Sequence, residues 1–123
     1  MKKQFPAISD AEWEIMKALW EHSPVNVNEL TGQLAPAKKW HPKTVRTMLS
    51  RLVRKGAVGT SVIDGIYHYH PALSRENCSR RAAENFVDRV FDGALTPMIA
   101  QLVRRRPLTA EEKRELRKLL TET

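Results

Sequence analysis

One stretch of the sequence decides the fold: residues 41–56, which read HPKTVRTMLSRLVRKG. It opens with a histidine and a proline, and proline is favoured at the first position of a helix. Apolar side chains then follow at the spacing i, i+3, i+4, i+7 and i+8, as Val45, Met48, Leu49, Leu52 and Val53. This spacing places them on one face of a helix. A glycine at residue 56 is typical of a helix end. The stretch therefore predicts an amphipathic helix from about residue 42 to residue 55.

The remaining surface of this helix is basic. Between residues 38 and 55 the chain has no acidic residue and seven basic ones, which are Lys38, Lys39, Lys43, Arg46, Arg51, Arg54 and Lys55. At about 100° per residue, the side chains that point away from the apolar face are Lys43, Thr47, Ser50 and Arg54, with Thr44, Arg46 and Arg51 on the flanks. Cations neutralise DNA phosphates, and Arg and Thr can contact base edges. The pattern favours a helix that reads duplex DNA over the alternative, an ordinary solvated face.

Two roles are predicted within this basic face. The start of the helix is expected to reach deepest into the major groove and to read bases with Lys43, Thr44, Arg46 and Thr47. The later turns and the preceding loop are expected to hold phosphates with Arg51, Arg54, Lys38 and Lys39. Ser50 is short enough to let the helix approach closely, and it is counted among the DNA-binding residues.

The elements around this helix predict its fold. Capping boxes at residues 9–12 and 26–29 start two earlier helices, which end before Pro24 and Pro36. After the basic helix, apolar and polar residues alternate up to Asp64 and Gly65, a hairpin signal, and a second strand ends at Pro71. Three helices followed by a hairpin is the order of a winged helix-turn-helix, in which the third helix reads the major groove. The wing residues Asp64, Gly65 and Tyr67 are expected to touch the adjacent DNA backbone.

A second domain is expected after the wing. We place a DNA-binding domain at residues 1–73 and a helical dimerisation domain at residues 74–123, so that the fold class is mainly α. The helices of the second domain carry an apolar stripe made of Phe86, Val90, Phe91, Ile99, Leu102, Leu116 and Leu120. A two-fold partner would bury this stripe, and two-fold symmetry would suit two DNA half-sites. The alternative is that the stripe packs on the first domain.

The composition agrees with a nucleic-acid partner. The 123 residues carry a formal net charge of +7, which favours a polyanion such as nucleic acid or an anionic membrane surface. A single cysteine, Cys78, allows no intrachain disulfide. The sequence has no run of about 18 apolar residues, and its start has no apolar stretch typical of a secretory signal. We therefore expect a soluble, cytoplasmic protein without membrane insertion.

No set of residues predicts catalysis. The chain has no nucleophile elbow, phosphate loop or metal-hydrolase motif, so we expect no enzyme. His68 and His70 lie on one face of the predicted second strand, but two histidines without further ligands favour a wing surface over a metal site. Cys78 is expected to be an inert helical thiol. We therefore expect neither a metal nor a cofactor.

Three ordered segments carry a resemblance to a known family. They are ISDAEWEIM at residues 8–16, WHPKTVRTMLSRL at residues 40–52, and LTAEE with ELR between residues 108 and 117. Over nearly its whole length the chain resembles the penicillinase repressor family, the BlaI and MecI type of bacterial repressor. The resemblance implies a winged-helix domain, a helical dimerisation domain, and a homodimer on a palindromic operator. It also implies repression of β-lactamase-type or other stress and resistance genes.

The resemblance also raises the question of regulation. In the best-known members a membrane metalloprotease sensor controls the repressor, which is cleaved at an Asn-Phe bond that aligns with Gln101 and Leu102. Both positions differ here, and the arginines Arg104, Arg105 and Arg106 follow them, so cleavage at this bond is not predicted. Copper-sensing relatives carry a C-terminal cysteine cluster, which this tail lacks. Two rival functions remain: a non-specific nucleic-acid binder, and a winged helix that binds an acidic protein.

Overall fold

The computed structural model describes residues 6–123, which fall into two compact units. Unit 1 runs to Ala82, and unit 2 runs from Ala83 to Thr123. The expectation that the first residues carry no secretory signal falls largely on residues 1–5, which lie outside the described range. None of the described helices combines the length and the hydropathy that a bilayer span requires.

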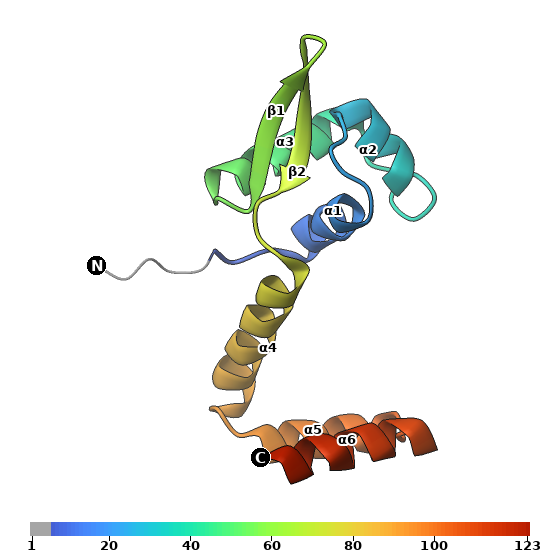
Figure 1. Cartoon of the computed structure of the whole chain (residues 1–123), viewed down its shortest axis with the longest axis vertical. Helices are drawn as coiled ribbons and strands as arrows, with labels where there is room; N and C mark the ends of the chain where they lie inside the picture. The colour runs from blue at the N-terminus through green and yellow to red at the C-terminus, as the bar shows by residue number, and fades with distance from the viewer. Residues whose placement is uncertain (1–5) are drawn as a thin grey trace, which may run out of the picture. The chain divides into compact units, whose positions relative to one another are not determined.

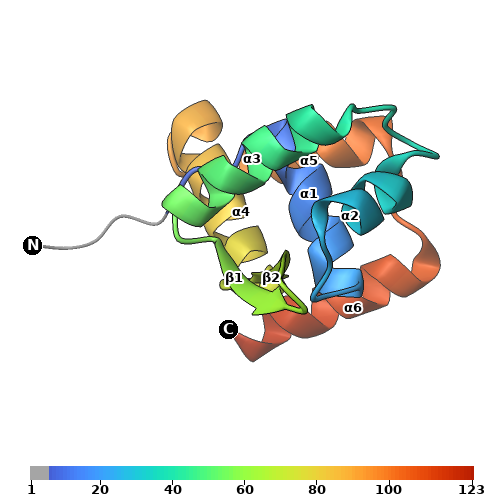
Figure 2. The same ribbon diagram turned by 90° about the horizontal axis from the view of Figure 1, so that it is seen from above.

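Unit 1 contains three helices followed by an antiparallel hairpin (Figure 1). Its elements are α1 (Asp10–Glu21), α2 (Val27–Leu34), α3 (Pro42–Arg54), β1 (Val58–Ile63), β2 (Ile66–Pro71) and the first turns of α4 (Arg75–Phe91). Figure 2 shows this unit from above, with α3 beside the hairpin. The predicted order of a winged helix-turn-helix is confirmed.

The predicted starts of the three helices are also confirmed. In α1 and α2 the side chain of the cap accepts from the backbone of a glutamate, and that glutamate accepts in return from the backbone of the cap. The caps are Ser9 and Asn26. At α3 the imidazole Nδ1 of His41 accepts from the Lys43 backbone N–H at 3.0 Å, and Pro42 takes the first helical position. These bonds satisfy backbone groups that a helix start leaves unpaired.

One hydrophobic core fixes the orientation of α3 in unit 1. The core gathers side chains from α1, α2, α3, β1 and the segments that connect them, namely Ile15, Met16, Leu19, Val25, Val27, Leu30, Leu34, Val45, Met48, Leu49, Leu52, Ala57 and Val58. Val53, which the periodicity placed on the apolar face, is instead 38% exposed. It lies about 80° around the helix from Val45, at the edge of the buried stripe. The core therefore holds α3 by four residues and leaves its other side open.

The hairpin has a tight two-residue turn. Ile63 pairs with Ile66, and the residues between them, Asp64 and Gly65, have φ values of 52° and 77°. Positive φ at both central positions defines a type I′ turn, whose twist matches that of the strands. Two backbone hydrogen bonds between Val25 and Tyr69 also attach β2 to the segment before α2. This attachment, which the sequence pattern did not predict, ties the wing to the helical part of unit 1.

The first turns of α4 pack within unit 1. The indole N–H of Trp20 donates to the Leu73 carbonyl oxygen at 3.0 Å, and Cys78 is only 1% exposed. Burial raises the pKa of the Cys78 thiol, as expected for an unreactive cysteine. The contacts thus group residues up to Ala82 with unit 1, whereas the sequence pattern placed the boundary at residue 73. Two independently folding domains remain a prediction.

Unit 2 is helical and buries few side chains. It contains the end of α4, then α5 (Leu95–Arg105) and α6 (Ala110–Glu122). A capping box made of Thr109 and Glu112 starts α6. In the part of unit 2 that the structure describes, neither α5 nor α6 has a buried residue, and Val87 of α4 is 7% exposed. The unit therefore exposes most of its apolar side chains.

Candidate nucleic-acid interface

The exposed face of α3 brings the predicted DNA-reading residues together. All seven predicted side chains of the helix are exposed, and they are Lys43, Thr44, Arg46, Thr47, Ser50, Arg51 and Arg54. The apolar face of α3 is buried in the core of unit 1. The basic face therefore cannot turn inward unless unit 1 unfolds. The result is a rigid surface of cations and short hydroxyl side chains, which suits the major groove.

The first turn of α3 adds to this positive surface. A helix N-terminus carries a partial positive charge and favours anions, and Lys43 adds a full charge in that turn. The Thr47 hydroxyl donates to the Lys43 carbonyl oxygen at 3.0 Å. Its donor is therefore occupied, and its methyl group and lone pairs are what it can present to a base.

Lys38 and Lys39 lie in the loop between α2 and α3, and both are exposed. The Lys38 ammonium lies 6.0 Å from the ring centroid of Trp40. Trp40 itself is half-buried and packs against the core of unit 1. The indole therefore anchors this loop beside the start of α3, with the two lysines available to phosphates.

Lys55 differs from the other basic residues of this region. Its ammonium lies 2.5 Å from Glu12 Oε1 and 2.8 Å from the Ala7 carbonyl oxygen. Glu12 is 2% exposed and belongs to the capping box of α1. Burial raises the pKa of this carboxyl, but the hydrogen bonds from Lys55 and Ser9 outweigh it, so the pKa of Glu12 lies below its usual value. Lys55 thus joins the end of α3 to the start of α1.

Glu12→Gln is expected to lower the free energy of unfolding at pH 7 by about 1–2 kcal/mol, a range that allows for the partial exposure of Lys55. A depressed carboxyl pKa stabilises the fold above the unfolded pKa of about 4 and stops doing so as pH falls through the folded value. Urea unfolding between pH 7 and pH 3.5 should therefore show the two proteins converging. Glu14→Gln removes a more exposed pair with Lys17 and should change stability by less than about 0.5 kcal/mol. A gap that does not narrow at low pH would contradict this reading.

The wing offers a different chemistry from α3. Asp64, Gly65 and Tyr67 are exposed, as a DNA contact requires. From residue 58 to residue 71 the sequence has no lysine or arginine, and Ile63 and Ile66 are exposed at its tip. A wing of this kind can meet DNA through hydroxyl groups, backbone N–H groups and apolar contact, but not through cationic side chains.

The two wing histidines do not assemble a metal site. His68 Nε2 lies 3.8 Å from Glu29 Oε1, and its Nδ1 lies 2.9 Å from the Ile66 carbonyl oxygen. The His70 ring lies against Gly59, where an added Cβ would come within 2.5 Å of its Nε2. No cluster of three or more potential metal ligands occurs within residues 6–123. His68 therefore forms a hydrogen bond within the hairpin, and His70 packs against the opposite strand at Gly59.

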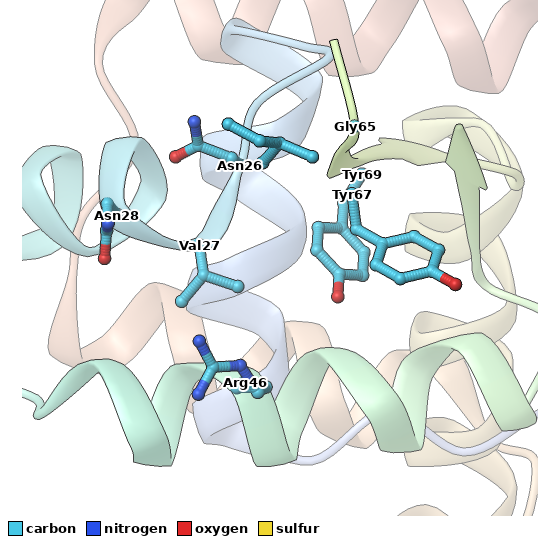
Figure 3. A pocket seen from close by; sticks show the side chains of 8 residues that line it. Asn26, Val27, Asn28, Arg46, Gly65, Tyr67 and Tyr69 are labelled. Carbon is cyan, nitrogen blue, oxygen red and sulfur yellow. The ribbon is translucent and has the colours of Figure 1, made fainter. Parts of the chain in front are cut away.

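A pocket of about 340 Å³ lies between α2, α3 and the wing (Figure 3). It is lined by Asn26, Val27, Asn28, Arg46, Gly65, Ile66, Tyr67 and Tyr69. Figure 3 shows the Arg46 side chain rising from α3 toward Val27, with the rings of Tyr67 and Tyr69 to the right of both. The sequence pattern did not predict that Asn26, Val27 and Asn28, the cap and the first two residues of α2, line this pocket. No local pattern shows that the start of this helix faces the wing. The cap at Asn26 was the available signal, since it fixed where α2 begins.

In unit 2 the predicted dimerisation residues are apolar side chains that are exposed or half-buried. Phe86, Val90, Ile99, Leu102 and Leu120 are each at least 38% exposed, and Phe91 and Leu116 are half-buried. Leu95 and Leu119, which the sequence analysis did not select, are about as exposed. Large apolar patches of this kind mark interaction surfaces in soluble proteins.

The bond between Gln101 and Leu102 lies inside α5, and both side chains are exposed. A protease binds its substrate chain in an extended form, so this part of α5 would have to unwind before cleavage. In the folded structure this bond is therefore not in the extended form that a protease binds.

The comparison with protein families decides the classification. The model of the family described as penicillinase repressor matches residues 8–122. The chain belongs to the penicillinase repressor family. The predicted resemblance is thus confirmed, and the family is one of transcriptional repressors.

Individual relatives in the penicillinase repressor family agree over the full length. The penicillinase repressor of Bacillus licheniformis is 36% identical over 120 residues, covering 98% of this chain and 94% of the relative. The methicillin resistance regulatory protein MecI of Staphylococcus aureus is 29% identical over 113 residues, covering 92% of each. The chain is therefore similar to both repressors across its two units.

Solved structures support the fold of unit 1. The DNA-binding domain of the repressor BlaI is 41% identical and superimposes with a TM-score of 0.54, covering 62% of this chain and 93% of that one. The monomeric form of Bacillus licheniformis BlaI, in complex with the blaP half-operator, gives a TM-score of 0.53 at the same identity and coverage. MarR of E. coli, at 20% identity and a TM-score of 0.53 over 94% of this chain, shares the fold.

Proposed function

We propose that this chain is a homodimeric repressor that binds palindromic operator DNA and controls β-lactamase-type or other stress and resistance genes. One observation carries the proposal: a rigid, exposed face of cations and short hydroxyl side chains on α3. Its similarity to BlaI, a repressor solved with its half-operator, supports the same use of that face. The proposed target is operator DNA, so we expect the protein to act in the cytoplasm.

The residues of the interface divide by role. We propose that the first turns of α3 read base edges, with Lys43, Thr44, Arg46 and Thr47 in that group. The distal turns and the preceding loop hold phosphates with Arg51, Arg54, Lys38 and Lys39, and Ser50 lets the backbone approach. The wing residues Asp64, Gly65 and Tyr67 contact the neighbouring DNA backbone without adding positive charge.

The homodimer is supported by the apolar surface of unit 2. Side chains such as Leu102 and Leu120 are more than half exposed in one chain, and a second copy would remove them from water. A two-fold pair places two copies of α3 on two half-sites, which is why we propose a palindromic operator. A membrane metalloprotease sensor remains a candidate regulator, and incubation with such a sensor tests it by mass measurement of any fragment ending at Gln101.

Selection of duplexes from a random pool tests the function directly. A repressor returns one sequence with two-fold symmetry at about 150 mM salt. A non-specific binder returns no preferred sequence and shows steep salt dependence. A winged helix that serves only to bind an acidic protein retains no duplex at that salt. Either of the last two results would overturn the proposal.

Thr47→Ala is expected to reduce discrimination between the selected duplex and a scrambled one by about tenfold, the usual effect of losing one base contact. Thr31→Ala is the matched control, because Thr31 also donates to a carbonyl four residues earlier, that of Val27, but lies on α2. Fluorescence anisotropy with both duplexes measures the ratio. Equal ratios for the two variants would remove Thr47 from the base readers.

A further inference from the structure

The pocket between α2, α3 and the wing gathers hydrogen-bond donors. Arg46 contributes a guanidinium group, and Tyr67 and Tyr69 contribute hydroxyl groups. Asn28 contributes an amide beside the first turn of α2, whose earliest backbone N–H groups have no partner within the helix. Within residues 6–123, the side chains of four of these lining residues have no hydrogen bond or ion pair, namely Asn28, Arg46, Tyr67 and Tyr69.

The charge that the lining of the pocket contributes is positive. Arg46 is the one ionised side chain among the lining residues, and no carboxylate belongs to the lining. Two acidic residues adjoin lining residues in the sequence: Glu29 follows Asn28, and Asp64 precedes Gly65. Glu29 Oε1 accepts from the Asn26 backbone N–H at 2.9 Å and lies 3.8 Å from His68 Nε2, and Asp64 is exposed at the tip of the wing. A cationic pocket rich in donors and without acceptor anions is complementary to an oxyanion.

The position of the pocket indicates which oxyanion it meets. It lies between the helix proposed to enter the major groove and the wing proposed to contact the neighbouring backbone. A DNA strand that borders both grooves must pass between these two elements, and it presents its phosphates there. A phosphodiester has two free oxygens, which match the fork of an arginine guanidinium.

We propose that this pocket holds one backbone phosphodiester in each half-site, with Arg46 as its cation and Tyr67 and Asn28 as supporting donors. This inference rests on the proposed function and refines it, because it moves Arg46 from base reading to positioning. A phosphate fixed between α2, α3 and the wing sets the depth and the register at which Lys43, Thr44 and Thr47 meet the bases.

The test uses duplexes in which one phosphate at a time is replaced by an uncharged methylphosphonate. In the parent protein one position in each half-site should weaken binding by about tenfold. In Arg46→Ala that position should have no further effect, because its partner is already gone. Arg54→Ala is the matched control, an exposed arginine of the same helix outside the pocket, and it should keep the loss at that position.

A second measurement separates phosphate binding from base reading. Arg46→Ala should weaken the selected and the scrambled duplex by the same factor. It should also reduce the slope of log K against log salt by about 2, since one phosphate contact is lost in each of the two half-sites. Arg46→Ala with unchanged sensitivity at every phosphate would overturn the proposal. So would a loss of discrimination with an unchanged slope, because Arg46 would then read a base.

Inorganic phosphate distinguishes the two sources of the anion. At about 1 mM it should leave the Arg46 Nε–H resonance unchanged, because a lone contact of this kind is weak without the rest of the duplex. Saturable binding at that concentration would make the pocket a free-phosphate site and overturn the assignment to DNA. If the proposed repressor function itself is wrong, the result is different from a failure of the phosphate assignment. The parent protein and Arg46→Ala would then both bind the selected and the scrambled duplex equally well.

Discussion

Phe86→Asp is expected to leave a monomer that binds the palindromic operator at least about a hundredfold more weakly than the parent protein. Phe86 is 43% exposed on α4 and lies 5.9 Å from Phe91, measured between ring centroids, in the surface proposed for dimerisation. A carboxylate there would lose its hydration on association. Two linked reading helices gain about 10²- to 10⁴-fold in affinity over one, and a monomer forgoes that gain.

The control for this variant is its neighbour. Asn85→Asp adds the same charge to an exposed position of α4 that belongs to no apolar surface, so it should remain a dimer. Sedimentation velocity gives the oligomeric state, and anisotropy gives the affinity for whole and half operators. A dimeric Phe86→Asp, or a monomer that retains full affinity for the whole operator, would remove the dimer from the proposed function.

Leu49→Ala is expected to lower the free energy of unfolding by about 2–5 kcal/mol, because it removes a fully buried side chain and leaves a cavity. Small proteins are stable by only about 5–15 kcal/mol, so the loss is a large share of the total. In a unit of this size each kcal/mol lowers the melting temperature by about 4–8 °C. Heating should therefore unfold the variant at least about 8 °C below the parent.

Ser50→Ala is the matched control for stability. Ser50 is the next residue along α3 but faces outward, so its replacement should change stability by less than about 0.5 kcal/mol. Thermal unfolding followed by circular dichroism, repeated in urea, measures both variants. Equal melting temperatures for the two would mean that the core does not hold α3 as described.

Local patterns predicted most of unit 1. Helices carry their own signals in caps and apolar spacing, and the hairpin carries its signal in Asp64 and Gly65. These features depend on residues a few positions apart, which is why their bounds agree with the structure. Contacts between distant residues were not predicted, such as the pairing of Val25 with Tyr69 and of Glu12 with Lys55. They depend on where whole elements come to lie, which no short pattern encodes.

The same distinction applies to the candidate site. The periodicity of α3 predicted which of its side chains would be exposed, and the structure places all seven at the surface. The periodicity of α3 could not predict which residues of other elements lie next to each exposed side chain. Arg46 lies beside the start of α2 and the tyrosines of the wing, and only tertiary structure places it in a different environment from Arg54.

The type I′ turn of the wing has a thermodynamic consequence. Asp64 and Gly65 hold the hairpin in one conformation, and the hydrogen bonds of Tyr69 to Val25 tether its second strand. The conformational entropy of this segment is therefore lost during folding and not during complex formation. A variant with a longer, glycine-rich tip would have to order that loop when it binds the duplex. Calorimetry should therefore measure a more unfavourable binding entropy for this variant than for the parent protein.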